Sequence, residues 1–489
     1  PATTLARPDI VDRNGRLMAT DVQIPALYAD AALIQDPDET AERMVALFGH
    51  KDVRGLRKSL ADKSNRFVWL KRGLSPRMAQ SVHNLGLPGL SFVDEVRRTY
   101  PAGRLGGHLL GRVDIDNRGT AGLERYIDEM GASEAAHGAR LSARAPVRLS
   151  VDLGVMHALN DELLAAIDRY EAAGAAGIVL DAQSGEIVAS VSLPGADPGS
   201  AEEGLDPSRT DKLMAGTYEL GSVMKLVTVA MALEDGKTPD TMVDTTAPLT
   251  AGRYTIEDLH PLGRPMSVAE VFIHSSNVGA GQLALQSGAE RQKAFLERLG
   301  LWAPLGTEAG SGPEPLRPQS IGRAEQITLS FGHGLAVTPL QFVAAAASLL
   351  NGGTRVTPTL LSRDGAAQSG DQVVTAKTSE ALRALMRLNV TDPSGSGRRA
   401  DVAGYRVGGK TGTAEMAVDG GYKKKSVIAS FLGAFPAEAP RYVTFVMLFE
   451  PKGQKETGGE ITAGRNAAPV TARIIERIAP LLGVRVAGL

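Results

Sequence analysis

The sequence predicts an α+β fold in which helices cover the faces of one antiparallel sheet. Two β-rich runs within residues 177–193 flank a Gln-Ser-Gly turn, a pattern typical of a hairpin. Helical segments then dominate residues 221–350. Three further β-rich runs lie between residues 407 and 450, and an apolar helical run over 467–482 follows them. This order of strand pair, helical middle, three strands and final helix favours a single sheet.

A domain boundary is predicted near residue 146. Upstream, the chain is mixed and rather polar, with short helical runs such as residues 38–50, and it ends in an Ala-, Gly- and Ser-rich stretch over 131–147. A length of 489 residues is also long for one hydrophobic core. We therefore expect two domains, residues 1–145 and 146–489.

The composition excludes several classes of protein. The net charge is −2 without a concentrated basic face, which argues against a nucleic-acid partner, and the run Lys423–Lys425 is interpreted as a solvated turn between two strands. The chain has no cysteine, so disulfides and thiolate metal sites are excluded. No run of about 18 apolar residues occurs. Because the chain opens at Pro1 rather than Met, we expect a processed or truncated product whose signal or anchor lies upstream.

The first candidate for chemistry is the pair Ser222 and Lys225. Residues three apart on a helix share one face and lie within reach of each other. A serine hydroxyl is a weak nucleophile until a base takes its proton, and a lysine can be that base if desolvation or nearby positive charge lowers its pKa. The same pair also fits an amphipathic helix with a capping serine and an exposed lysine. By itself, therefore, it does not decide the chemistry.

The second candidate is the pair Ser275 and Asn277, which precedes an apolar helical run. A hydroxyl can relay a proton, and an amide can both donate to and accept from a substrate peptide bond. Serine and asparagine also open helices routinely as N-caps, so this pair too has a purely structural interpretation.

The third candidate is the run from Lys410 to Thr413 on a predicted strand. Strand alternation places Lys410 and Gly412 on one face, and Thr411 and Thr413 on the other. A glycine lets a ligand backbone approach closely, and the lysine and threonines suit a substrate carboxylate.

The same stretch contains a nucleotide-binding pattern. Residues 404–411 match G-x-x-x-x-G-K-T, the phosphate-binding loop of many nucleotide-binding proteins. That loop requires a buried strand before it and a helix after it. Here polar residues precede it and glycine-punctuated strands follow, so nucleotide binding is not favoured.

Taken together, the three segments are far more specific than any one of them. They occur in the order Ser-x-x-Lys, Ser-x-Asn and Lys-Thr-Gly, and this set resembles the penicillin-recognising serine enzymes, namely penicillin-binding proteins and serine β-lactamases. The resemblance implies a sheet plus a helical subdomain, with the active serine between them. No G-x-S-x-G elbow or H-E-x-x-H motif is present, the eight histidines are scattered, and no metal or other cofactor is expected.

Segments outside the motifs resemble class B penicillin-binding proteins. Residues 7–19 are similar to the signature R-G-x-I-x-D-R-N-G-x-x-L-A, with Pro8 where glycine is usual. The tail over 462–484 is similar to that of the division-specific FtsI type. Other matching segments resemble the N-terminal pedestal domain, at residues 97–113 and 117–128, and the transpeptidase domain, at residues 329–341 and 402–416. The resemblance therefore implies an elongated mixed α/β pedestal over 1–145 and a transpeptidase domain over 146–489.

The resemblance also implies a role for each motif residue in acyl transfer from a D-Ala–D-Ala stem peptide. Lys225 activates Ser222, Ser275 relays protons, and Asn277 holds the substrate amide. The backbone N–H groups of Ser222 and Thr413 form the oxyanion hole. The terminal carboxylate is received by the strand residues Lys410, Thr411 and Thr413, beside Gly412.

Ligands, partners and location follow from the same resemblance. The expected ligands are peptidoglycan stem peptides, as acyl donor and amine acceptor, and β-lactam antibiotics, which would acylate Ser222. The expected partners are an FtsW-type glycosyltransferase and other divisome proteins. A single upstream membrane helix would anchor the protein to the inner membrane with its catalytic domain in the periplasm.

Three alternatives keep the same acylation chemistry. The first is an elongation-type class B transpeptidase, which would have other partners. The second is a D,D-carboxypeptidase or β-lactamase that hydrolyses the acyl-enzyme. The third is a non-enzymatic β-lactam receptor. The long N-terminal part favours transpeptidation over all the hydrolytic and receptor functions.

Overall fold

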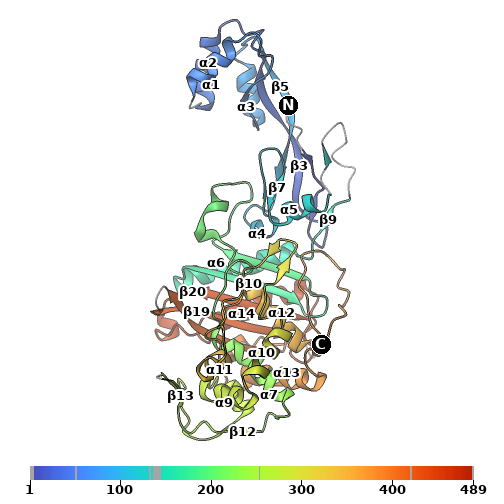
Figure 1. Cartoon of the computed structure of the whole chain (residues 1–489). Coiled ribbons are helices and arrows are strands. Elements are labelled where there is room, and N and C mark those ends of the chain that lie inside the picture. Colours follow the sequence, from blue (N-terminus) through green and yellow to red (C-terminus); the bar gives the residue numbers. More distant parts are fainter. Residues whose placement is uncertain are drawn as a thin grey trace.

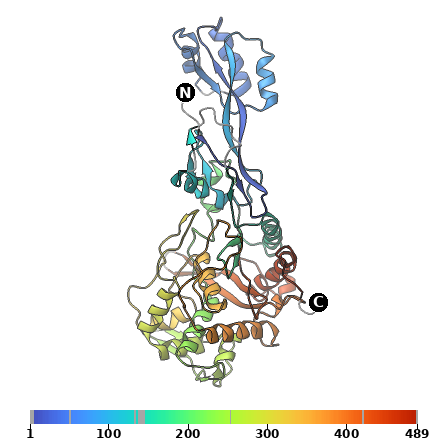
Figure 2. The same cartoon turned by 90° about the vertical axis from the view of Figure 1, so that its right-hand side faces the viewer.

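The protein is elongated, with a head, a long two-stranded arm and a compact body (Figure 1 and Figure 2). The computed structural model describes residues 5–49, 52–131, 134–135, 145–252, 254–418 and 421–486. The Ala-, Gly- and Ser-rich stretch ahead of the predicted boundary lies mostly outside these residues.

The body is built on one five-stranded antiparallel sheet with the order β11-β10-β20-β19-β18. Its strands are β10 (Gly174–Asp181), β11 (Ile187–Leu193), β18 (Gly408–Val418), β19 (Gly421–Phe435) and β20 (Tyr442–Phe449). The predicted hairpin is β10–β11, and β10 pairs in turn with β20, so the early and late strands form a single sheet. The predicted sheet is confirmed. The prediction for Lys423–Lys425 is wrong, because these residues lie within β19 and not in a turn.

Helices cover both faces of this sheet. Every residue of β10, β11 and β20 is buried, which requires cover on both sides. The helices α6 (Leu153–Tyr170) and α14 (Ala467–Leu481) pack against each other and against the sheet. Another helix, α12 (Pro339–Leu350), packs on β10 and β20 and joins the sheet to the helical subdomain.

The helical subdomain surrounds α7 (Lys225–Glu234), whose residues from Lys225 to Ala232 are all buried. It also contains α8 (Val268–Ile273), α9 (Asn277–Ser287), α10 (Ala289–Arg298), α11 (Arg323–Ser330) and α13 (Ala376–Thr391). No helix follows Thr411, which lies inside β18, so the phosphate-binding-loop geometry does not form. Within the described ranges, no helix has the length and apolar character needed to cross a bilayer.

The arm and the head lie upstream. The strands β3 (Leu17–Ala29) and β5 (Leu90–Thr99) pair over ten residues, a length of about 33 Å, and β4 (Val68–Lys71) joins the far end of β3. At that end, α1 (Pro37–Phe48), α2 (Val53–Ala61) and α3 (Pro76–His83) close a small apolar core separate from that of the body.

Two helices between the arm and the body share the apolar core of the body (Figure 1). Leu109 of α4 (Gly107–Leu110) and Leu123 of α5 (Gly122–Glu129) belong to the same apolar cluster as α6 and the sheet. A buried ionic network braces this region: Glu124 lies 2.7 Å from the Nε atoms of both Arg7 and Arg98. Arg7 is therefore held by Glu124, although the next residue is Pro8 and not the glycine of the signature that residues 7–19 resemble.

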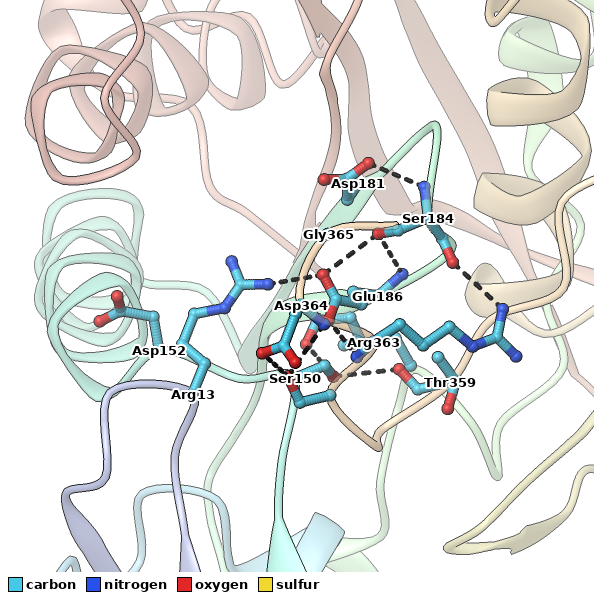
Figure 3. A network of polar contacts seen from close by, with 12 residues as sticks. Arg13, Ser150, Asp152, Asp181, Ser184, Glu186, Thr359, Arg363, Asp364 and Gly365 are labelled. Atoms are coloured by element: carbon cyan, nitrogen blue, oxygen red, sulfur yellow. Dashed lines mark hydrogen bonds and ion pairs between the residues drawn. The ribbon is translucent and has the colours of Figure 1, made fainter. Parts of the chain in front are cut away.

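Arm and body are also joined by a polar network around Glu186 (Figure 3). The buried Glu186 carboxylate lies 2.7 Å from Arg13 Nη2 and accepts hydrogen bonds from the Arg363 backbone N–H at 2.6 Å and from the Ser184 hydroxyl at 3.2 Å. Next to it, Asn14 donates to the Asp152 carboxylate at 2.8 Å. Residues near the start of the chain thus neutralise a charge buried beside the hairpin of the sheet.

We expect Arg13→Ala to destabilise the body by about 3 kcal/mol, because removing one member of a buried ion pair leaves the other charge uncompensated. The matched control is Arg16→Ala: Arg16 lies 3.7 Å from Asp152, and its side chain is 57% exposed. Breaking such an exposed pair should cost about 1 kcal/mol or less. Equilibrium denaturation of both variants measures the difference, and equal effects would contradict the role given to Arg13.

Candidate active site

Ser222 lies at the junction of the helical subdomain and the sheet. It belongs to a 3-10 turn, η3 (Gly221–Met224), which leads directly into α7. Side chains three residues apart eclipse each other in a 3-10 turn, and Lys225 Nζ lies 2.9 Å from Ser222 Oγ. Gly221 enters the turn with φ of 61°, and a Cβ atom there would lie 2.6 Å from the Thr413 carbonyl oxygen. The glycine therefore allows the serine turn to pack directly on β18.

Lys225 is fully buried among neutral acceptors. Besides Ser222 Oγ, its Nζ lies 2.6 Å from the Ser275 carbonyl oxygen, 3.1 Å from Ser275 Oγ and 2.7 Å from Asn277 Oδ1. Burial lowers the pKa of Lys225 well below its usual value, the charge of Lys410 lowers it further, and Asp258 opposes both. A neutral amine has a lone pair, which can accept the serine proton.

The Ser-x-Asn segment is held in a tight turn between α8 and α9. Ser275 has φ of 59°, and Ser276 caps α9 by accepting from the Gly279 N–H. The Asp258 carboxylate accepts from the Asn277 N–H at 2.6 Å and from the Ser276 hydroxyl at 2.6 Å. These bonds orient Ser275 and Asn277 toward Lys225.

Lys410 reaches the same cluster from the sheet. Its Nζ lies 3.0 Å from Ser275 Oγ and 5.7 Å from the centre of the Phe272 ring. Burial lowers the pKa of Lys410 to about 7. The Ser275 hydroxyl thus bridges two lysines whose pKa values are both lowered, an arrangement that can pass a proton between them.

The remaining motif residues follow the predicted alternation along β18. A Cβ atom on Gly412 would lie 2.7 Å from the Leu220 carbonyl oxygen, so this face packs on the segment ahead of Ser222. On the opposite face, Thr411 donates to Ser396 Oγ at 2.7 Å, and Thr413 Oγ1 accepts from the Ala463 N–H at 3.1 Å. Among the described strands β18 is at the edge of the sheet, so one side of its backbone is open to pairing with an extended peptide.

The structure therefore brings all the predicted residues to one place, and it adds others that the sequence analysis missed. Asp258 supports the Ser-x-Asn turn, and Ser396 contacts Thr411. Neither lies in a recognisable pattern. Gly332, with φ of 86°, packs on the backbone of Gly221. It lies in segment 329–341, which already resembled a transpeptidase domain, so the sequence did point to this region. Within the described ranges, no group of three or more His, Cys, Asp or Glu side chains could hold a metal ion.

Comparison with known families agrees with this geometry. Residues 175–476 match the model of the penicillin binding protein transpeptidase domain, and residues 3–132 match the model of the penicillin-binding protein dimerisation domain. The chain belongs to the penicillin-binding proteins. The predicted fold class and the resemblance to the class B, FtsI type are confirmed.

The similar proteins include peptidoglycan D,D-transpeptidases by name. "Probable peptidoglycan D,D-transpeptidase FtsI" of Caulobacter vibrioides is 37% identical over 490 residues, which cover 98% of this penicillin-binding protein and 82% of the relative. "Probable peptidoglycan D,D-transpeptidase PenA" of Neisseria meningitidis is 31% identical, over 99% of this chain and 85% of the relative. The solved transpeptidase domain of Burkholderia pseudomallei penicillin-binding protein 3 shares 29% identity, with a TM-score of 0.61, over 70% of this chain and 98% of that one.

Proposed function

We propose that this protein is a peptidoglycan D,D-transpeptidase that cross-links septal cell wall through an acyl-enzyme on Ser222. The observation that carries the proposal is the position of Lys225: its Nζ is buried, lies 2.9 Å from Ser222 Oγ, and has no carboxylate among its hydrogen-bond partners in the described part of the chain. A lysine held in this way is a base matched to a serine nucleophile.

In the acylation step, Lys225 takes the hydroxyl proton while Ser222 Oγ bonds to the carbonyl carbon of the penultimate D-Ala. Collapse of the tetrahedral intermediate breaks the bond to the terminal D-Ala, whose amine receives the proton through Ser275. An amine of a second stem peptide then attacks the ester, loses a proton to Lys225, and Ser222 leaves as the hydroxyl. Asn277, whose Oδ1 accepts from Lys225 Nζ at 2.7 Å, would hold the substrate amide.

Residues of β18 would bind two groups of the substrate, the oxygen of the reacting carbonyl and the terminal carboxylate. The close packing of Gly221 on Thr413 supports an oxyanion hole formed by the N–H groups of Ser222 and Thr413. Loss of one such donor typically slows turnover about 10²–10³-fold. The terminal carboxylate is received by Lys410, Thr411 and Thr413, beside Gly412.

Family membership supports a proposal for the domain roles and the cellular context. Residues 1–145 are the non-catalytic pedestal and 146–489 the catalytic domain. The pedestal would dock an FtsW-type glycosyltransferase and other divisome proteins, and an inner-membrane helix upstream would hold the catalytic domain in the periplasm.

The proposal is tested by following the fate of the acyl-enzyme. With lipid-linked substrate and an FtsW-type partner, we expect released D-Ala and cross-linked stem dimers, whereas penicillin should leave a long-lived adduct seen by mass spectrometry. Rapid turnover of penicillin would instead support a β-lactamase or carboxypeptidase. Adduct formation without any cross-linking would support a receptor.

Depletion of the protein from cells tests the division role separately. Filamentous cells are expected if septal synthesis fails. Rounded cells would show that the transpeptidase serves elongation.

A further inference from the structure

Asp258 lies outside all three motifs, in the loop that follows β14 (Tyr254–Ile256), and its carboxylate reaches the start of α9. One carboxylate oxygen accepts from the Asn277 N–H at 2.6 Å and from the Val278 N–H at 3.0 Å. The other accepts from the Ser276 hydroxyl at 2.6 Å. This one side chain therefore holds both the Ser-x-Asn turn and the first turn of α9.

The negative charge of Asp258 is not cancelled by a direct counterion. Within the described ranges its carboxylate forms no ion pair, and its hydrogen bonds come from N–H and hydroxyl groups that carry no net charge. The charge is felt at Lys225 instead. Burial and Lys410 lower the pKa of Lys225, and attraction to Asp258 raises it.

The carboxylate also offsets the positive end of α9. The free N–H groups in the first turn of a helix together carry about half a positive charge, which disfavours a cation nearby. Lys225 contacts the first residue of this helix, because its Nζ lies 2.7 Å from Asn277 Oδ1. Asp258 accepts from the first two N–H groups of α9, so it places a full negative charge where the helix would otherwise oppose a proton on Lys225.

The other titratable groups around Lys225 do not replace this charge. Lys410 on β18 meets Lys225 through the Ser275 hydroxyl and repels a second positive charge. Burial lowers the pKa of His333, which follows α11, so this imidazole is mostly uncharged at neutral pH. In the part of the chain that the structure describes, four further groups border the site without bonding to Lys225: Glu219, Glu257, His274 and Glu415.

We propose that Asp258 is a positioning residue for acylation whose negative charge stabilises the ammonium group that forms on Lys225. In that step the O–H bond of Ser222 breaks, the proton bonds to the Lys225 amine, and Oγ bonds to the substrate carbonyl carbon. A positive charge then appears on Lys225 while a negative charge appears on the carbonyl oxygen. Asp258 favours this separation without touching the substrate, as the aspartate of a serine–histidine–aspartate triad favours its imidazolium. The inference rests on the proposed function and adds one residue to it.

Asp258→Asn separates the charge from the hydrogen bonds, because an amide oxygen can still accept from the N–H groups of α9. We would measure the second-order rate of penicillin acylation of the full chain across a wide pH range. The midpoint of the rising limb should move about one pH unit lower, since loss of an opposite charge lowers the pKa of Lys225. The plateau should fall about threefold, because a weaker base takes the serine proton less readily. The two profiles should therefore cross, with the variant about threefold faster than the wild type on the acid side.

Asp258→Ala removes the hydrogen bonds as well, so it should show the same shift of the midpoint with a larger loss of plateau rate. The matched control is Asp36→Asn: Asp36 also accepts from two N–H groups at the start of a helix, α1, but lies in the head. Its profile should coincide with that of the wild type.

Two outcomes would overturn the inference: profiles of the Asp258 variants that coincide with that of the wild type, or a lower plateau in both variants without a shift of the midpoint. The second outcome is what a purely structural role predicts. Failure of the wild type to form any penicillin adduct would instead overturn the proposed function.

Discussion

Ser222→Ala is expected to abolish covalent labelling by a fluorescent penicillin. The methyl side chain cannot form the ester. Ser275 is the other described serine whose hydroxyl contacts Lys225, and its Oγ, 3.1 Å away, is shared with Lys410. Loss of the nucleophile costs about 10⁶-fold in turnover in a well-studied serine hydrolase. Gel fluorescence after incubation with the labelled penicillin measures the effect, and the release of D-Ala from a stem peptide should stop in parallel.

The fold should survive this change, because a single hydroxyl is removed from a partly exposed side chain. Ser208→Ala, at an exposed serine of the same domain, is the control and should label like the wild type. Retained covalent labelling in Ser222→Ala would show that another residue is acylated.

Lys225→Met is expected to slow acylation by about 10²–10⁴-fold, the usual contribution of a positioned general base. Lys225→Arg should be almost as slow, because a guanidinium remains protonated and cannot accept the serine proton. The control is Lys212→Met, since Lys212 is a half-buried lysine whose pKa is also lowered by burial but whose ammonium lies over the Phe449 ring instead of beside the serine.

The pH profile of acylation gives an independent test of the same base. The reactive form of Lys225 is the neutral amine, so the rate should rise with pH and level off once the amine is deprotonated. Because burial and Lys410 lower its pKa well below 10.5, the plateau should begin well below that pH. A rate that continued to rise tenfold per unit toward pH 10.5 would mean that Lys225 carries its ordinary pKa and is no base at neutral pH.

Much of the fold could be predicted because its signals are local. The hairpin at β10–β11, the strands after Lys410 and the helix α14 each follow from alternation or helical spacing within a short segment. The error at Lys423–Lys425 has the same origin: a run of like charges favours a solvated turn, but pairing of β19 with β18 extends the strand through it.

Residues that act from outside the motifs could not be predicted. Asp258 supports Asn277 from 19 positions away, and Ser396 meets Thr411 across 15 positions. The residues next to Asp258 and Ser396 in sequence carry no pattern that marks these contacts. The fold of the whole domain, and not local spacing, brings the carboxylate to Asn277 and the hydroxyl to Thr411.

By itself, the sequence determined which residues could do the chemistry: Ser222 and Lys225 share a face because they are three positions apart, and the order of the three motifs is typical of a single enzyme family. Only the tertiary structure decided that Lys410 meets Ser275, 135 positions away, and that Lys225 forms its hydrogen bonds, within the residues that the structure describes, to neutral oxygens and not to a carboxylate. The physical reason is desolvation. A lysine is a base near neutral pH only when packing from several distant segments removes water and counter-charge, and short-range spacing does not specify that packing.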